Sequence, residues 1–198
     1  MYHQGHFLYE RFNSVAGNVV VKIPINPSID SVKTEYDGLK AIGRLAKENI
    51  PINCTLIFTP EQALLAAKAG AEYVSPFAGR IDDDLRKKFG EKFDKSDYYP
   101  GEGKRDDNHN LFEDNGIVSG IDLVAKTVQI LKNYNLNTEV IAASIRNPRQ
   151  ARECMLVGAH IATIPFSVLE KMVYHGKTEE GIKDFARDLV PEYETLFD

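Results

Sequence analysis

The sequence lacks most of the features that mark secreted, membrane-spanning or disulfide-stabilised proteins. Only two cysteines occur in 198 residues, Cys54 and Cys154, and they lie far apart in the chain. No stretch resembles a secretory leader, and no apolar run is long enough to span a bilayer. Together these absences predict a cytoplasmic protein with reduced thiols and no membrane partner.

Clusters of basic residues are also absent. The chain holds 24 Lys and Arg against 29 Asp and Glu, which gives a net charge of -5 and a pI near 5.6. Without a basic run dense enough to follow a phosphate backbone, a nucleic-acid partner is not expected. An acidic or phosphorylated small substrate would have to be held by individual arginines. The length and the 43% hydrophobic content suit one domain with a sizeable core.

Short strand-like runs alternate along the chain with stretches of helical spacing. The strand-like runs are Asn18 to Ile25, Ile52 to Phe58, Glu72 to Ser75, Thr138 to Ala143 and His160 to Pro165. The helical stretches are Tyr2 to Phe12, Ser31 to Glu48, Thr59 to Ala69, Gly116 to Tyr134, Asn147 to Val157, Phe166 to Tyr174 and Thr178 to Leu196. This alternation predicts parallel βαβ construction. Thr59-Pro60 and Asn147-Pro148 are typical of capped helix starts, so both helices should begin directly after a strand.

The segment from Ile81 to Asn115 interrupts this alternation. It is crowded with charge, contains Tyr98-Tyr99-Pro100-Gly101, and is longer than an ordinary βα connection. We expect a short helix from Asp83 to Phe93, followed by a loop. Two interpretations stay open at this point: a solvated surface insertion, or a lid over the carboxyl ends of the strands.

A lysine interrupts the first apolar strand-like run. In Val19-Val20-Val21-Lys22-Ile23-Pro24 the side chains alternate between two faces, so Val20 and Lys22 share one face. Inside a sheet or barrel an ammonium group loses hydration, which destabilises its charged form. A neutral lysine can attack a carbonyl carbon, as Schiff-base catalysis requires. The alternative is a solvent-exposed lysine on an edge strand.

Polar residues gather where the other predicted strands end. These positions matter because the active site of a parallel barrel lies at the carboxyl ends of its strands. Asn53 and Thr55 share a face, where they would orient a water or a carbinolamine, unless Thr55 only satisfies a neighbouring backbone group. Arg80 and Arg146 would converge with Ser144 on a phosphate, unless they form surface ion pairs.

Several motifs together resemble the transaldolase family. They are Val19-Val20-Val21-Lys22-Ile23-Pro24, Asn53-Cys54-Thr55-Leu56-Ile57-Phe58, Gln62-Ala63-Leu64-Leu65-Ala66-Ala67-Lys68-Ala69-Gly70, Tyr73-Val74-Ser75-Pro76-Phe77-Ala78-Gly79-Arg80 and Ala143-Ser144-Ile145-Arg146-Asn147-Pro148. The likeness runs in order from about Tyr9 to the C-terminus and includes the sister fructose-6-phosphate aldolases. It implies an α/β fold, the (β/α)8 TIM barrel of the class I aldolases, present here as a partial barrel covering strands 4 to 8.

The resemblance also implies a catalytic set. Lys22 matches the family's Schiff-base lysine, Thr55 the threonine that positions the catalytic water, and Asn53 the asparagine that contacts the bound donor. The implied activity is transfer of a dihydroxyacetone unit between sugar phosphates in the pentose phosphate pathway. No metal or cofactor is expected, and the chain is expected to form a homo-oligomer.

A second set of residues matches the family's substrate site. Ser75 matches a serine that contacts the substrate, while Arg80, Ser144 and Arg146 match the sugar-phosphate site. Phe77 stands where fructose-6-phosphate aldolases usually carry tyrosine. This difference favours transfer over free aldol cleavage.

The family's first three βα units have no counterpart in the chain. They carry an acid/base aspartate, substrate-binding Thr-Asn residues and a glutamate that cooperates with the catalytic water. Five strands cannot close an eight-stranded barrel, so we expect exposed edges and exposed inner side chains at Val20, Leu56 and Val140. Residues 1–198 are thus expected to form one N-terminally incomplete barrel domain, with an insertion at 81–115 and a C-terminal helix at 178–198.

Three functions therefore stay open. The chain is a transaldolase, a fructose-6-phosphate aldolase-type lyase, or a non-catalytic, truncated remnant that binds sugar phosphates. Either it is a fragment or truncated gene product, or another polypeptide completes the barrel. The enzyme needs a carboxylate from another chain or from the insertion, where Asp82, Asp83 and Asp84 are candidates because they follow a strand end.

Overall fold

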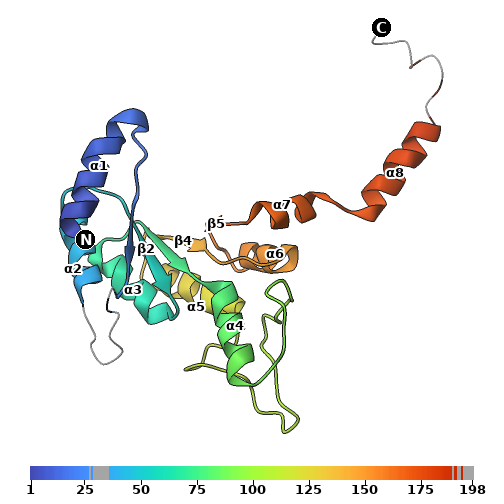
Figure 1. Cartoon of the computed structure of the whole chain (residues 1–198), viewed down its shortest axis with the longest axis horizontal. Helices are drawn as coiled ribbons and strands as arrows, with labels where there is room; N and C mark the ends of the chain where they lie inside the picture. The colour runs from blue at the N-terminus through green and yellow to red at the C-terminus, as the bar shows by residue number, and fades with distance from the viewer. Residues whose placement is uncertain (27, 29–35, 189, 191–192, 194–198) are drawn as a thin grey trace. The chain divides into compact units, whose positions relative to one another are not determined.

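Five strands form one parallel sheet in the computed structural model, and each strand neighbours the next one in the sequence (Figure 1). The structure describes residues 1–26, 28, 36–188, 190 and 193. The chain divides into two units, Met1–Ile164 and Pro165–Asp198. The elements of the first unit are α1 (Tyr2–Ala16), β1 (Val21–Pro24), α2 (Asp37–Lys47), β2 (Ile52–Ile57), α3 (Pro60–Ala69), β3 (Tyr73–Pro76), α4 (Ala78–Lys88), α5 (Gly120–Asn133), β4 (Glu139–Ala142), α6 (Pro148–Leu156) and β5 (Ile161–Ala162). The second unit holds α7 (Phe166–Val173) and α8 (Gly176–Arg187).

The strand pairing confirms the predicted βαβ construction. All four strand pairs are parallel, and their register places Lys22 beside Asn53, Asn53 beside Tyr73, and Tyr73 beside Glu139. Residues in register on neighbouring strands point to the same face of a sheet. One face therefore carries a row of polar side chains. Lys22, Asn53, Tyr73 and Glu139 are exposed or half-buried, whereas Thr55 and Ser75, further along the same face, are buried.

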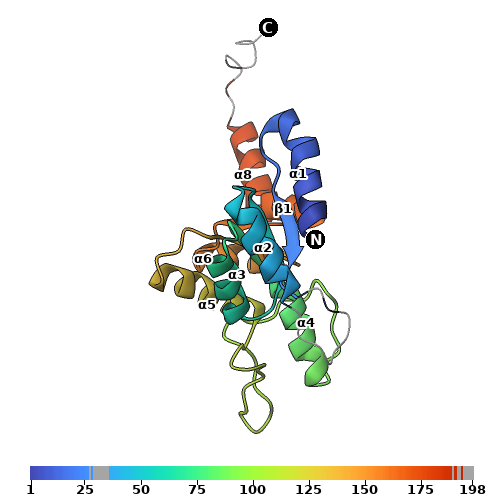
Figure 2. The ribbon, with the colours of Figure 1, turned by 90° about the vertical axis from the view of Figure 1, so that its left-hand side faces the viewer.

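The opposite face of the sheet is packed against helices. Its side chains are fully buried at Ile52, Cys54, Val74, Val140 and Ala142. Helix α3 contacts its neighbours α2 and α5 over this face, and the three helices contact strands β1 to β4 (Figure 2). Complete burial of an Ile or Val side chain contributes about 1.5–3 kcal/mol, so this face is a main source of stability.

One expectation about the open sheet proves wrong. Val140 is buried rather than exposed, because it lies in register with Val74 on the helix-covered face. Of the two interpretations of Lys22, the described residues agree with the solvent-exposed lysine on an edge strand. Helices α1 and α2 contact β1, with Gly5 of α1 close to the Val21 side chain, and this leaves Lys22 on the other face. Val20 is 39% exposed, as expected. Leu56, which was also expected to be exposed, is half-buried.

Helix α4 begins earlier than the sequence predicts. It starts at Ala78, directly after β3 and well before the expected start at Asp83. The Ala78 N–H donates to the Ala143 carbonyl oxygen at 3.0 Å, and this bond ties the start of α4 to the end of β4. For the helices predicted at 31–48 and 178–196, residues 31–35, 189, 191–192 and 194–196 lie outside the described part of the chain.

Both predicted helix caps are confirmed. The Thr59 Oγ1 accepts the Gln62 N–H at 3.2 Å, and the Gln62 Oε1 accepts the Phe58 and Thr59 N–H groups at 2.8 and 3.3 Å. The Asn147 side chain likewise accepts the Gln150 N–H at 2.8 Å. Helix α3 begins shortly after β2, whereas residues 143–147 separate α6 from β4. Each cap fixes where its helix begins at the carboxyl edge of the sheet.

A buried carboxylate joins α4, α5 and α6. Asp82 is only 2% exposed, and it accepts hydrogen bonds from the Gly120 N–H at 2.6 Å and from the Gln150 Nε2 at 2.7 Å. Burial raises the pKa of Asp82 to about 7, because it disfavours the charged form more strongly than the two hydrogen bonds and the nearby Arg86 charge favour it. The carboxyl group therefore links three helices, although removing it from water costs free energy.

The second unit consists of α7 and α8. Its helix α8 carries ion pairs on its own surface, including Lys183 to Glu179 at 2.6 Å and Lys177 to Glu180 at 2.8 Å. Among the residues that the structure describes, no helix is both long and apolar enough to cross a bilayer.

The raised pKa of Asp82 makes the stability of the fold depend on pH. The folded protein holds this proton more tightly than the unfolded chain does, so the free energy of unfolding falls as the pH rises from the ordinary pKa of 3.8 to about 7. This contribution reaches about 1.4 kcal/mol per pH unit at most. In Asp82→Asn the contribution should vanish, and urea unfolding at several pH values measures the difference in slope between the two proteins. The half-exposed Asp84→Asn serves as the control, and parallel pH profiles for wild type and Asp82→Asn would contradict the assignment.

The sheet edges and the outer face of α1 predict self-association. Within the described residues β1 and β5 each pair on one side only, and α1 exposes Phe7, Leu8 and Phe12 by 56%, 45% and 48%. Unpaired edges and clustered apolar side chains favour association in water. We expect residues 1–198 to elute as oligomers in size-exclusion chromatography with light scattering. A monodisperse monomer at all concentrations would show that these surfaces are tolerated in solution.

Candidate active site

Three of the predicted site residues meet on the polar face of the sheet. Lys22 of β1 lies in register with Asn53 of β2. The Ser75 hydroxyl of β3 donates a hydrogen bond to the Asn53 Oδ1 at 2.7 Å. An amine, an amide and a hydroxyl on neighbouring strands can hold a polarised carbonyl group, because they offer a nucleophile and hydrogen-bonding partners on one surface.

Thr55 lies further along the same strand, next to an irregularity. It pairs with Pro24, one step along the face from the Lys22 and Asn53 pair, and this agrees with the predicted shared face of Asn53 and Thr55. The register of β2 then shifts, and Leu56 has a positive φ of 60°. Thr55 is 8% exposed, and its buried Oγ1 has no hydrogen-bond partner among the described residues. The alternative role, satisfaction of a neighbouring backbone group, therefore lacks support.

Phe77 positions the first of the two predicted arginines. It stands between β3 and α4, and its ring centroid lies 5.8 Å from that of Phe58. The Arg80 guanidinium lies over the Phe77 ring at 4.9 Å. A cation over an aromatic face is attracted by about 0.5–1 kcal/mol at an exposed site, so Phe77 favours one orientation of the exposed Arg80 side chain.

The second arginine lies against the start of α4. Ser144 has a positive φ of 64°, which turns the chain between β4 and α6. A Cβ at Gly79 would overlap the Ser144 carbonyl oxygen and the Arg146 side chain, so only glycine allows this close approach. The Arg146 Nη2 forms an ion pair with the Asp83 Oδ2 at 3.0 Å.

Hydrogen bonds fix the backbone of Arg146 as well. Its N–H donates to the Gln150 Oε1 at 2.8 Å, and the Gln150 Nε2 donates in turn to the buried Asp82. The Arg146 Nε and the Asp83 Oδ1 are buried, and neither has a hydrogen-bond partner within the described residues. The Arg146 side chain is therefore held by one ion-paired nitrogen, while the backbone beneath it is firmly anchored.

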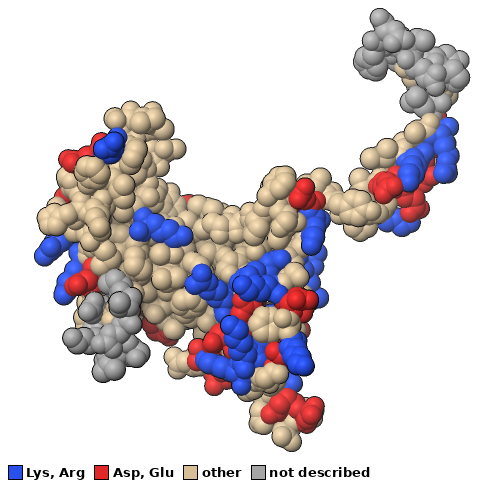
Figure 3. Space-filling view, in the orientation of Figure 1, with Lys and Arg blue, Asp and Glu red and all other residues tan. Residues whose placement is uncertain are grey.

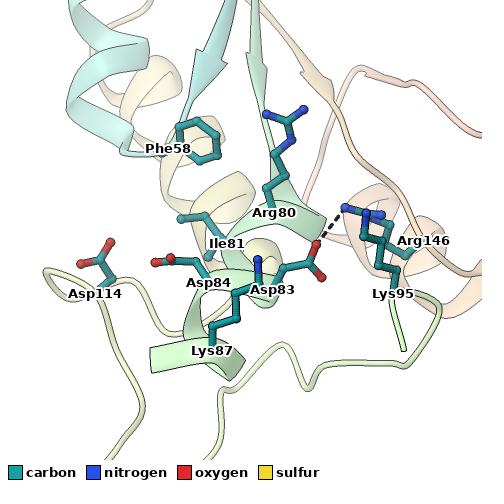
Figure 4. A pocket seen from close by; sticks show the side chains of 9 residues that line it. All are labelled: Phe58, Arg80, Ile81, Asp83, Asp84, Lys87, Lys95, Asp114 and Arg146. Carbon is teal, nitrogen blue, oxygen red and sulfur yellow. Dashed lines mark hydrogen bonds and ion pairs between the residues drawn. The ribbon is translucent and has the colours of Figure 1, made fainter. Parts of the chain in front are cut away.

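Both arginines line an open pocket of about 560 Å³ (Figure 4). Its lining is formed by Phe58, Arg80, Ile81, Asp83, Asp84, Lys87, Lys95, Asp114 and Arg146. Acidic and basic side chains are intermixed over α4 and the loops around it (Figure 3). A pocket of this size with several cations suits a small anionic ligand.

The structure thus divides the predicted residues between two places. Lys22, Asn53 and Ser75 form the row on the sheet, while Arg80 and Arg146 line the pocket. Ser144 and Phe77 are absent from the pocket lining and act on it through the backbone turn and the ring described above.

Sequence reasoning missed several residues of this region. Phe58, Lys87, Lys95 and Asp114 line the pocket, and Gln150 supports Arg146. The sequence did indicate Gln150, because it lies three residues after the helix cap Asn147, just as Gln62 lies three residues after the cap Thr59. The sequence provided no such indication for Lys87, Lys95 and Asp114, because their positions in the pocket depend on the tertiary structure of the 81–115 segment.

None of the three aspartates that are candidates for the missing catalytic carboxylate is free. Asp83 pairs with Arg146, and Asp84 pairs with Lys88 at 2.9 Å. Asp82 does not line the pocket and is bonded to Gly120 and Gln150. Each of these carboxylates therefore already has a structural partner.

Comparison with known proteins places the chain in one family. Residues 1–196 match the family described as Transaldolase/Fructose-6-phosphate aldolase. The chain is similar to proteins named Probable transaldolase from Herpetosiphon aurantiacus (41% identity over 184 residues, 92% of this chain and 65% of the relative) and Aquifex aeolicus (39% over 194 residues, 97% and 69%). A third from Chlorobium phaeobacteroides is 40% identical over 188 residues, or 95% of this chain and 63% of the relative. The chain thus spans about two thirds of the length of these relatives. Its parallel sheet is part of a TIM barrel of their type, and the chain belongs to the transaldolase/fructose-6-phosphate aldolase family.

Proposed function

We propose that this chain is a transaldolase that moves a dihydroxyacetone unit between sugar phosphates through a Schiff base on Lys22, in the pentose phosphate pathway. The observation that carries the proposal is the row on the sheet, in which Lys22 lies beside an Asn53 already bonded to Ser75. Membership of the family, whose matched relatives are named as transaldolases, supports the same reaction class.

The reaction begins at the Lys22 amine. The neutral amine attacks the ketone carbon of a ketose phosphate, and the carbinolamine that forms is protonated and loses water to give a protonated imine. A base then takes the proton from the hydroxyl on the second carbon beyond the imine carbon. The carbon–carbon bond breaks and an aldose phosphate leaves. The electron pair of the broken bond moves toward the cationic imine nitrogen, so that the lysine-bound fragment remains as a neutral enamine. Attack of the enamine on a second aldose phosphate, followed by hydrolysis, releases the new ketose phosphate and the free amine.

The neighbouring residues receive separate roles in this proposal. Asn53 and Ser75 hold the hydroxyls of the bound donor, and the unpartnered Thr55 hydroxyl orients the water that is lost and later returns. Arg80 and Arg146, with the turn at Ser144, bind the phosphate.

None of the three candidate aspartates of the 81–115 segment is free to carry the proton in this reaction. Asp83 and Asp84 are held in ion pairs, and Asp82 bonds to two helices away from the pocket lining. We therefore propose that an aspartate on a further strand, from another polypeptide or segment, completes the site. The same observation favours a second candidate function, binding of sugar phosphates without turnover.

Imine trapping tests the role of Lys22. Incubation with fructose 6-phosphate, reduction with borohydride and peptide mapping should place a dihydroxyacetone-derived adduct on Lys22, because imine formation needs this amine. Lys22→Arg keeps the charge but should abolish the adduct. Adducts spread over exposed lysines such as Lys40 would contradict the proposal. Supplying a segment with an aspartate-bearing strand should raise turnover, and binding without turnover even then would favour the second candidate.

Loss of the pocket arginine tests the phosphate site. A charge-assisted hydrogen bond contributes about 1.5–3 kcal/mol, so Arg146→Ala should weaken sugar-phosphate binding about tenfold or more in isothermal titration. Dihydroxyacetone without phosphate should bind equally well to both proteins. Arg152→Ala removes an exposed arginine of α6, the helix that follows Arg146; Arg152 does not line the pocket, and its loss should have little effect. Equal losses for phosphorylated and unphosphorylated ligands would mean that Arg146 is structural.

A further inference from the structure

The carboxylates of the pocket all have cationic partners. Asp83 pairs with Arg146 at 3.0 Å. Asp84 and Asp114 share Lys88, at 2.9 and 3.1 Å, and Lys88 is not itself part of the pocket lining. Together with Lys88, the region therefore holds five cations against three carboxylates, which leaves an excess of positive charge.

Three cations of the lining are left over. Within the part of the chain that the structure describes, Arg80, Lys87 and Lys95 have no carboxylate within ion-pair distance. Arg80 contacts only an aromatic ring among the interactions of this region. A concave surface with an excess of one charge concentrates ligands of the opposite charge, so the pocket attracts anions.

Lys95 comes from the insertion, yet its backbone neighbours are pinned beside the pocket. The carbonyl oxygen of Ser96 accepts a hydrogen bond from the Asn147 Nδ2 at 3.2 Å, and that of Asp97 accepts one from the Arg86 Nη2 at 3.0 Å. Asn147 is the cap of α6 and directly follows Arg146. The stretch after Lys95 is therefore tied to α4, which carries Arg80, and to the residue that directly follows Arg146.

The same stretch is anchored from the other side by a buried cation. Arg86 is 2% exposed and lies over the rings of Phe93 and Tyr99 at 4.9 and 5.0 Å. Tyr99 belongs to a buried cluster with Ile81 and Leu85 of α4. These contacts fix the backbone on both sides of Lys95, so that only its flexible side chain is free to move in the pocket.

We propose that Lys95 is a further phosphate-binding residue, which makes the 81–115 segment part of the substrate site and a determinant of preference for phosphorylated substrates. This inference rests on the proposed function for the identity of the ligand. One of the two pocket arginines is shared with Asp83, and a phosphate monoester carries more than one negative charge. A lysine ammonium adds a compact charge that adapts to the phosphate position, beside guanidinium groups that fix its orientation.

Charge-removing variants at two lysines of the segment test the inference. Lys95→Gln should weaken binding of inorganic phosphate and fructose 6-phosphate about threefold to tenfold in isothermal titration, and the loss should shrink at high salt. Lys92→Gln removes an equally exposed charge of the segment that does not line the pocket, and it should change these constants little. Lys95→Arg should restore most of the affinity.

Imine trapping with unphosphorylated dihydroxyacetone separates this inference from the proposed function. The yield of adduct on Lys22 should be the same in wild type and Lys95→Gln. Equal phosphate affinities for Lys95→Gln and Lys92→Gln would overturn the role of Lys95, even where the Lys22 adduct forms. A selective loss in Lys95→Gln without any Lys22 adduct would instead support the anion site and contradict the transaldolase proposal. A loss at Lys95 that is equal for phosphorylated and unphosphorylated ligands would also overturn the inference.

Discussion

A chain of hydrogen bonds from α5 to the end of β4 sets the geometry of the pocket. Gly120 donates to Asp82, Gln150 donates to the same carboxylate, and the Arg146 N–H donates to Gln150. Each link is part-buried or buried, where a polar group without a partner costs about 1–3 kcal/mol. The three helices are therefore held in one arrangement, and the arginine that follows β4 is carried with them. Gly79 completes this arrangement, because it lets the Arg146 side chain lie directly on α4.

The sheet has a stabilising face and a chemical face. Side-chain alternation sends the large aliphatic residues of β2, β3 and β4 against the helices and leaves Lys22, Asn53 and Ser75 on the other side. The buried aliphatic residues and the candidate reactive residues thus occupy alternate positions of the same strands. The two faces depend on each other, since the register that buries Val74 also brings Ser75 to Asn53.

Local signals predicted most of the fold. Strand-like runs, the capped starts at Thr59 and Asn147 and the residues at strand ends were readable, because each depends on near neighbours in the sequence. Lys22 was identified from its place in an apolar strand, but the sequence left its exposure open, because exposure depends on which elements cover that face. Val140 was assigned to the wrong face for the same reason.

The insertion shows the limit of sequence reasoning in another way. Its charged residues gave no indication of which ones reach the pocket, since this depends on long-range bonds such as Asn147 to Ser96. The pairing of Asp83 with Arg146 and the burial of Asp82 also join segments far apart in the chain. The sequence left open whether this segment is a solvated insertion or a lid, and the structure places part of it against α4 and α6.

Closure of the barrel and completion of the site are coupled in the proposed function. Lys22 lies exposed on the open sheet. Further strands would cover the polar face, and the same step would bring an aspartate within reach of the substrate. The proposed phosphate-binding residues Arg80, Arg146 and Lys95 already line one pocket of this chain. In this proposal, substrate capture and imine formation use residues of the chain itself, whereas the proton transfer of the cleavage step depends on the added strands.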